Sequence, residues 1–223
     1  MPAAPLSPSV AGVTPALTMY GRALVEGRDL RLMRRDGSQL PVDLTRYRGA
    51  VDAVDLDLVD RCCGPTLDVG CGPARFVSAL MARGLPALGV DLAPGAVAVA
   101  RSAGATVLHR SVFGPLPGEG RWATVLLLDE NVGIGGCPTT LLSRIRELLG
   151  PNGLALVEAD PDDGVDDRGH LRMVDDRGER SAPFPWARMG ADAVELVAAG
   201  TGLATVERWR LGRRSFVSLT RTA

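Results

Sequence analysis

Two short segments of the chain carry residue types that could bind a ligand. Residues 68–72 read Asp-Val-Gly-Cys-Gly, a carboxylate followed by two glycines at alternate positions. Glycine has no side chain, so backbone N–H and carbonyl groups can approach a ligand closely there. Twenty-one positions after Gly70 stands Asp91, where a doubly wound fold offers a carboxylate to ribose hydroxyls. The spacing therefore predicts a ribose-bearing ligand.

Strands and helices alternate around these segments. Strands are predicted over residues 65–69, 87–90, 106–108, 123–128 and 154–158, and helices over residues 51–61, 76–83, 94–103, 140–149 and 191–199. Alternation of this kind indicates a parallel sheet with helices on both faces. Gly150 is expected to cap the fourth of these helices and Pro151 to stop it. A hairpin, residues 204–209 and 215–220, closes the chain.

The rest of the chain falls outside this alternation. Residues 1–15 are rich in Pro, Ala and Ser and are expected to be a disordered tail. Residues 16–50 predict an N-terminal cap made of a helix and a hairpin, and residues 51–223 the main domain. Within that domain, residues 160–185 are acidic, Arg-rich and punctuated by glycine, and we interpret them as an insertion that could act as a lid. Phe184–Arg188 is expected to open the last helix.

A dinucleotide is one alternative ligand for the glycine segment. The G-x-G-x-x-G pattern of dinucleotide-binding proteins requires a third glycine at position 75, for close packing of helix on strand. This chain has Arg75 there. A nucleotide-dependent oxidoreductase is therefore the less favoured hypothesis.

The pattern Asp68-x-Gly70-x-Gly72-x-Ala74, followed by Asp91, resembles class I S-adenosylmethionine-dependent methyltransferases. The resemblance covers about residue 60 to the C-terminus. It implies an α/β, Rossmann-like, doubly wound sheet of seven strands with the last strand antiparallel. It also implies that the glycine loop surrounds the methionyl end of S-adenosylmethionine and that Asp91 holds both ribose hydroxyls.

The resemblance also implies contacts to the adenine. Leu92 is expected to lie against the base, whereas the Asp that often follows the third strand in the family is replaced here by Ser111, a weaker acceptor. The expected cofactor-binding residues are Asp68, Gly70, Cys71, Gly72, Asp91, Leu92, Ser111, Val112 and Asp129. His109, at the end of the third strand, is expected to pack near the adenine.

The segment after the fourth strand is predicted to face the methyl acceptor, because open α/β sheets bind ligands outside the carboxyl ends of their strands. It reads Asp-x-Asn-x-Gly-Ile-Gly-Gly from Asp129, and similar small bacterial methyltransferase-domain proteins have such a stretch here. Asp129 is a candidate general base or acceptor-orienting group, or merely caps the loop. Asn131 is a candidate hydrogen-bonding partner of the acceptor, and His170 a candidate base from the insertion.

Composition argues against several partners. The net charge of −1 provides no positive electrostatic field that would attract nucleic acid. The aromatic share of 4% argues against a surface on which bases could stack. The Asn/Asp-Pro-Pro-Tyr type of motif, with which RNA and DNA methyltransferases bind a flipped base, is absent after the fourth strand. No apolar run approaches the ~20 residues that span a bilayer, and residues 1–16 lack signal-peptide features. We expect a cytoplasmic protein without nucleic-acid or membrane partners.

Metal binding is not expected either. The four cysteines lack metal-ligand spacing, and the acidic run of residues 160–167 fails the calcium-loop template. All basic residues are Arg, which is typical of a GC-rich and so bacterial genome.

We therefore predict methyl transfer from S-adenosylmethionine to a small-molecule acceptor, with S-adenosylhomocysteine as product, and expect it in secondary metabolism. Whether the acceptor atom is O, N or C stays open, as does the oligomeric state. The alternatives are a domain that uses S-adenosylmethionine for other chemistry and one that serves as a binding module.

Overall fold

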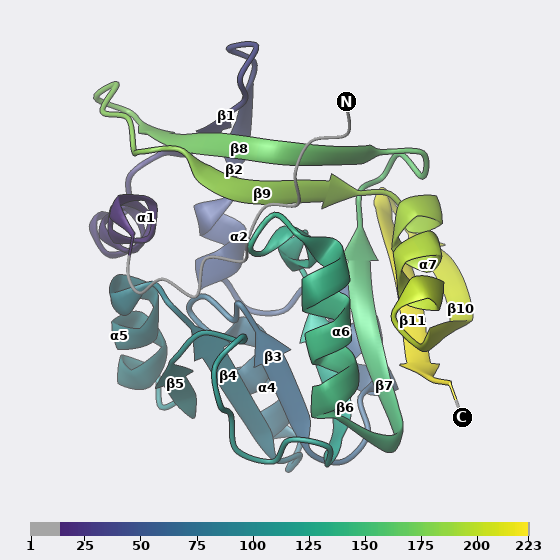
Figure 1. The fold of residues 1–223 in the computed structure, drawn as a ribbon. Coiled ribbons are helices and arrows are strands. Elements are labelled where there is room, and N and C mark those ends of the chain that lie inside the picture. Colours follow the sequence, from purple (N-terminus) through teal and green to yellow (C-terminus); the bar gives the residue numbers. More distant parts are fainter. Residues whose placement is uncertain (1–13, 223) are drawn as a thin grey trace. The chain divides into compact units, whose positions relative to one another are not determined.

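The computed structural model of the protein describes residues 14–222 and contains eleven strands within that range (Figure 1). They are β1 (Leu30–Met33), β2 (Gln39–Val42), β3 (Thr66–Val69), β4 (Ala87–Asp91), β5 (Val107–His109), β6 (Trp122–Leu127), β7 (Leu149–Ala159), β8 (Asp166–Asp175), β9 (Phe184–Met189), β10 (Leu203–Leu211) and β11 (Arg214–Arg221). The smaller sheet has the order β2-β1-β8-β9, and the larger sheet the order β10-β11-β7-β6-β3-β4-β5.

Seven α-helices and one 3-10 turn connect these strands in the described range. They are α1 (Pro15–Glu26), α2 (Leu44–Arg48), α3 (Ala53–Arg61), α4 (Arg75–Ala82), α5 (Pro94–Ser102), η1 (Asn131–Gly133), α6 (Pro138–Leu148) and α7 (Ala191–Gly200). None of the described helices is long and apolar enough to cross a membrane.

The chain divides into two units. Of the described residues, 14–114 and 170–184 form the first unit, and 115–169 and 185–222 the second. The first contains β3, β4 and β5, which are parallel neighbours, together with α1 to α5. The second contains β6 and β7, which are parallel, and β11, which is antiparallel to both β7 and β10.

Helix α1 begins at Pro15, the last residue of the predicted disordered tail. The Thr14 hydroxyl accepts from the backbone N–H of Leu17, Pro15 occupies the first turn, and Gly27 closes the helix in a left-handed conformation. These are the residue types that favour a helix start and a helix end. The remainder of the predicted tail, residues 1–13, lies outside the described residues.

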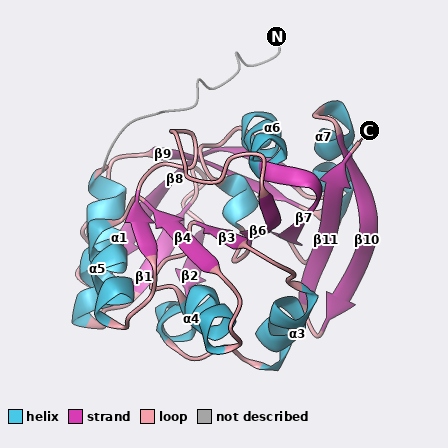
Figure 2. Ribbon diagram, turned by 90° about the horizontal axis from the view of Figure 1, so that it is seen from below, coloured by secondary structure: helices cyan, strands magenta, loops and turns pink. Residues whose placement is uncertain are grey.

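Helices α1 and α5 lie side by side in both ribbon views (Figure 1, Figure 2). Two glycines make this approach possible. A Cβ at Gly21 would lie 2.9 Å from the backbone nitrogen of Gly95, and a Cβ at Gly95 would lie 2.6 Å from the carbonyl oxygen of Gly21. The two helices therefore pack backbone against backbone, which requires glycine on both sides.

The N-terminal cap is built into the core of the first unit. Its buried side chains form one apolar cluster with residues from the start of α5, namely Met19, Ala23, Leu24, Leu30, Leu44, Ala93 and Ala96. Burial of apolar area contributes ~25 cal/mol per Å², so a cluster of this size stabilises the unit substantially. The cap is thus an integral part of the fold.

The predicted insertion pairs with this cap. Strand β8 is antiparallel to β1, with Leu30 opposite Asp175. Arg28 reinforces the pairing, because its Nη2 lies 2.8 Å from the Asp175 carboxylate, which is buried. Residues 172–175 of the predicted insertion therefore belong to a strand of the cap's own sheet.

Two local predictions were wrong. Helix α6 ends at Leu148, and Leu149 starts β7 at once, so Gly150 and Pro151 lie within a strand and do not cap the helix. The reason is tertiary: Leu149 pairs with Trp122 of β6, and this pairing overrides the local cap signal. The segment expected to open the last helix is strand β9, and α7 begins only at Ala191.

The contact between α1 and α5 can be tested by Gly21→Ala. Alanine is a better helix former, but here its methyl group meets the backbone of Gly95, so we expect a loss of about 1–3 kcal/mol in the free energy of unfolding. Gly200→Ala is the matched control: it lies in α7 with nothing within 4 Å of its Cβ position. Urea denaturation should show the control unchanged or slightly stabilised. Equal stabilities of the two variants would contradict the close packing.

Candidate functional site

The glycine loop turns sharply where β3 ends. Gly70 and Gly72 have φ angles of 70° and 54°, in the left-handed region that favours glycine. The backbone N–H groups of Gly70 and Cys71 both donate to the carbonyl of Val90, at 2.8 and 3.2 Å. Asp68, within β3, is buried. The loop is therefore fixed to the neighbouring strand β4.

The side chain of Cys71 fills space between β3 and β4. A Cβ at Gly89 of β4 would lie only 2.5 Å from its sulfur. Burial raises the pKa of this thiol, and the nearby Asp68 adds to the effect, so it stays protonated. The Cys71 side chain is therefore part of the buried core beside the loop.

Two positions at the end of this loop, Ala74 and Arg75, carry a side chain where related glycine patterns have glycine. Ala74 has a φ of 69°, a left-handed conformation that costs an L-residue about 1–2 kcal/mol, and it is fully buried. Arg75 begins α4, and its Nε lies 3.0 Å from the buried carboxylate of Asp55, which Arg46 also contacts at 3.0 Å. A side chain at position 75 is thus held by an ion pair with α3.

Asp91 joins the glycine loop to the turn before α5. One carboxylate oxygen accepts from the N–H of Gly72 at 2.8 Å, and the other accepts from the N–H of Ala93 at 2.7 Å. The backbone N–H of Leu92 also contributes a hydrogen bond to this carboxylate. A carboxylate has about four acceptor positions, so these contacts do not exhaust its capacity. Burial raises the pKa of Asp91, against the effect of these backbone hydrogen bonds.

The residues after β5 were expected to contact an adenine. Ser111 accepts from the N–H of Phe113 at 3.2 Å, so its hydroxyl stabilises its own turn. Val112 is buried, and His109 is exposed with its Nε2 3.0 Å from the carbonyl oxygen of Leu92. His109 and Leu92 are thus brought together, whereas the expected adenine contacts stay predictions.

Tyr20 is a site residue that the sequence reasoning missed. Its hydroxyl lies 3.0 Å from the position that a Cβ of Gly72 would occupy. The sequence predicts only a helix in this part of the cap, and no motif connects Tyr20 with a loop about fifty residues away. The hydroxyl group of Tyr20 was the one feature of the sequence that could have indicated a binding role.

The second unit holds the segment predicted to face the acceptor. Asp129 and Glu130 have φ angles of 54° and 61°, two consecutive non-glycine residues in the left-handed region. The N–H of Asp129 donates to Glu158 of β7 at 2.8 Å, and Arg214 of β11 holds the same carboxylate with two hydrogen bonds, at 2.7 and 2.8 Å. This network stabilises the strained turn.

The glycines that follow serve packing. A Cβ at Gly133 would lie 2.0 Å from the carbonyl oxygen of Ala187, and one at Gly136 would lie 2.8 Å from Pro185. Ile134 also forms a β-bridge with Trp186. The Gly-Ile-Gly-Gly part of the motif thus lets β9 lie directly on the loop, and Asn131 begins η1 next to it.

His170 lies on β8, where it is exposed. The structure assigns it to the first unit, and Asp129 and Asn131 to the second. Its proposed role as a base stays a prediction.

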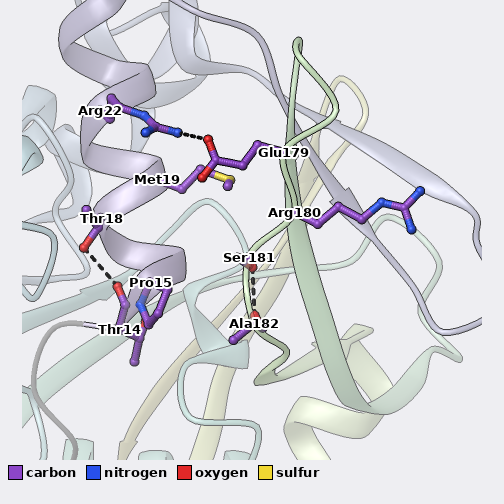
Figure 3. Close-up of a pocket in the computed structure, with 9 residues that line it drawn as sticks. All are labelled: Thr14, Pro15, Thr18, Met19, Arg22, Glu179, Arg180, Ser181 and Ala182. Atoms are coloured by element: carbon purple, nitrogen blue, oxygen red, sulfur yellow. Dashed lines mark hydrogen bonds and ion pairs between the residues drawn. The ribbon is translucent and has the colours of Figure 1, made fainter.

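A pocket of about 440 Å³ opens in the first unit between the start of α1 and residues 179–182 (Figure 3). In Figure 3, Arg22 and Glu179 face each other and form an ion pair of 2.6 Å, while Arg180 extends away. The volume is in the range of small-molecule sites. Among the described residues, no three His, Cys, Asp or Glu side chains are grouped to hold a metal ion.

Comparison with known families bears on the first unit and the start of the second. A family model described as a methyltransferase domain matches residues 67–127. The chain contains a methyltransferase domain. The match starts in β3, includes the glycine loop and Asp91, and ends with β6. It confirms the predicted methyltransferase family, and no curated protein matches the sequence.

Solved structures extend the likeness to the whole fold. An S-adenosylmethionine-dependent methyltransferase from Bacteroides fragilis, in complex with S-adenosyl-L-homocysteine, has a TM-score of 0.82 at 18% identity and covers 97% of this chain and 100% of its own. The 1,6-didemethyltoxoflavin-N1-methyltransferase of Burkholderia thailandensis has a TM-score of 0.60 at 18% identity (93% and 87% covered). An amino pentose methyltransferase from Micromonospora echinaspora has 0.56 at 21% identity (80% and 94%). The predicted class I methyltransferase fold, with seven strands and an antiparallel end, is confirmed.

The network around Glu158 can be tested by Glu158→Ala. The change leaves Arg214, whose side chain is 16% exposed, without its carboxylate and the N–H of Asp129 without its acceptor, so we expect a loss of about 3 kcal/mol in unfolding free energy. Glu158→Gln keeps an acceptor oxygen and should lose less. Glu147→Ala, an exposed ion pair on α6, is the control and should cost at most about 1 kcal/mol. Urea denaturation that ranks Glu158→Ala with this control would contradict the assignment.

Proposed function

We propose that this methyltransferase domain binds S-adenosylmethionine and transfers its methyl group to a small molecule. The observation that carries the proposal is the placement of Asp91. Its carboxylate closes the glycine loop through Gly72, and its backbone hydrogen bonds do not use all of its acceptor positions. Two adjacent hydroxyls of a ribose match that arrangement.

The residues around the loop fit the rest of such a cofactor. Gly72 has no side chain, and the Tyr20 hydroxyl lies above it at hydrogen-bonding reach of a polar group placed there. Asp68, Gly70 and the Cys71 backbone complete the loop around the methionyl end. Leu92, Ser111 and Val112 follow β4 and β5, where we propose that they line the adenine. Relatives of the same fold were solved with S-adenosylhomocysteine.

The bound cofactor supplies a sulfonium methyl group that is already activated for transfer. The residues of this chain then have to hold the acceptor in line, exclude water and accept a proton where the acceptor carries one. We assign these tasks to Asp129 and Asn131 at the carboxyl end of β6, with Asp129 also beside the cofactor and His170 as a further base.

The small-molecule acceptor is supported by what the relatives act on. The Burkholderia enzyme was solved with 1,6-didemethyltoxoflavin, and the Micromonospora enzyme is an amino pentose methyltransferase involved in calicheamicin biosynthesis. Both names refer to small molecules. We therefore retain secondary metabolism as the proposed setting.

Isothermal titration with S-adenosylmethionine and S-adenosylhomocysteine tests the cofactor. Asp91→Asn removes the charge that receives the hydroxyls, and hydrogen bonds to charged groups contribute about 1.5–3 kcal/mol, so the dissociation constant should rise roughly 10- to 100-fold. Asp57→Asn, a surface carboxylate of α3 paired with Arg61, is the matched control and should bind normally. Absence of heat with either ligand in the unaltered protein would refute the proposal.

The pH dependence of binding gives a second test. The hydroxyls bind the ionised carboxylate, and burial raises the pKa of Asp91, so affinity should fall as the pH drops through that raised pKa. The fall should begin at a higher pH than for an ordinary aspartate and should be missing in Asp91→Asn. Titrations between about pH 4 and 8 measure it. A parallel fall in both proteins would assign the effect to another group.

A further inference from the structure

The glycine loop, residues 70–74, is held at its end by a contact of a different kind from those at its start and middle. Backbone hydrogen bonds to β4 and to Asp91 hold the start and the middle. The loop ends where α4 begins, at Arg75. The Nε of Arg75 lies 3.0 Å from a carboxylate oxygen of Asp55 on α3. An ion pair therefore ties the end of the loop to a helix outside it.

This ion pair lies in the interior of the first unit. The side chain of Asp55 is fully buried, and that of Arg75 is 5% exposed. The other carboxylate oxygen of Asp55 lies 3.0 Å from Nη2 of Arg46, on helix α2 of the N-terminal cap. The Arg75 guanidinium also lies over the ring of Phe76, 4.5 Å from its centroid. One buried carboxylate thus joins the cap, α3 and the end of the loop.

Local physical chemistry disfavours both residues at this end of the loop. Ala74 has a φ of 69°, a conformation that glycine adopts without strain and alanine does not. Arg75 places a cation in the first turn of α4, where the helix dipole favours an anion. No side chain caps the start of this helix. Residues that break local rules at consecutive positions are expected where tertiary structure or function requires them.

We propose that Arg75 is a positioning residue for cofactor binding. Paired with Asp55, it keeps residues 70–74 in the conformation that receives the methionyl end of S-adenosylmethionine. The proposal rests on the proposed methyltransferase function and adds a residue that acts through the loop. Arg46 brings the N-terminal cap into the same arrangement, which links the cap to cofactor affinity.

The physical reason lies in what a buried ion pair contributes. The loss of hydration offsets most of the Coulomb attraction, so such a pair adds little net stability. A planar guanidinium, however, binds a carboxylate in few orientations, unlike an apolar side chain that packs in many. The ion pair of Arg75 with Asp55 therefore fixes the place where α4 begins, and with it the end of the loop.

The double variant Asp55→Leu/Arg75→Met separates the position of the loop from the stability of the fold. Apolar residues of similar size replace a buried ion pair with little loss of stability, and Arg46 keeps Asp52, 3.6 Å away, as a partner. We expect a urea midpoint near that of the unaltered protein. The dissociation constant for S-adenosylhomocysteine should rise at least about tenfold, as for a loop in the binding conformation roughly a tenth of the time. Isothermal titration measures it.

Two further variants identify the cause of a weaker affinity. Leu148→Ala removes a fully buried side chain of α6 in the second unit, so it should lower the urea midpoint and leave the dissociation constant unchanged. Arg75→Lys keeps the charge without the planar guanidinium and should weaken binding by less than the double variant does. Affinities that follow the urea midpoints across these variants would overturn the proposal.

Unaltered affinity in a folded double variant would also overturn it. Should the double variant not fold, Arg75→Lys replaces it in this comparison, and unaltered affinity there counts equally against the proposal.

Hydrogen exchange tests the loop without any ligand. The N–H of Ala74 donates to the carbonyl of Cys71 at 2.9 Å, within the loop. In the double variant this amide should exchange at least about tenfold faster than in the unaltered protein, whereas the amides of β7 should keep their rates. Equal exchange of Ala74 in both proteins would overturn the proposal. Absence of heat in the unaltered protein refutes the proposed function instead, and hydrogen exchange then decides by itself whether the loop depends on Arg75.

Discussion

The hydrogen bonds of Asp91 with Gly72 and Ala93 are the constraint on which the candidate cofactor site depends. One side chain connects the loop after β3 with the turn after β4, so neither can move alone. The carboxylate is half-buried and therefore loses part of its hydration, which raises its pKa. The hydrogen bonds from the backbone N–H groups of Gly72 and Ala93 partly offset the lost hydration. They also fix the orientation of the carboxylate.

The N-terminal cap matters to the site because α1 approaches α5 through glycine backbone. Gly21 and Gly95 allow the two helices to touch, and Gly95 follows the first residue of α5, directly after the turn that Asp91 holds. One residue before Gly21 is Tyr20, whose hydroxyl reaches the glycine loop. The cap therefore contributes a polar group to the site and owes its position to a packing contact that tolerates no methyl group.

Local chemistry explains what the sequence could predict. Gly70 and Asp91 follow or end neighbouring parallel strands, so the alternation of strands and helices and the position of the glycine loop were predictable, whereas the roles of these residues stay predictions. The prediction that Gly150 caps a helix was wrong, because Leu149 already pairs with Trp122 of β6 as the first residue of a strand. Tyr20 was out of reach for the same reason: only tertiary packing places α1 over a loop far along the chain.

The segment after β6 concentrates features that lower stability. Asp129 and Glu130 are both left-handed, and each such residue costs about 1–2 kcal/mol that glycine would avoid. A carboxyl with a raised pKa and no fixed partner adds a further cost at neutral pH. Glu158 and Arg214 offset part of it by holding the Asp129 backbone. The turn after β6 therefore persists because tertiary contacts from β7 and β11 restrain a backbone conformation that its own residues disfavour.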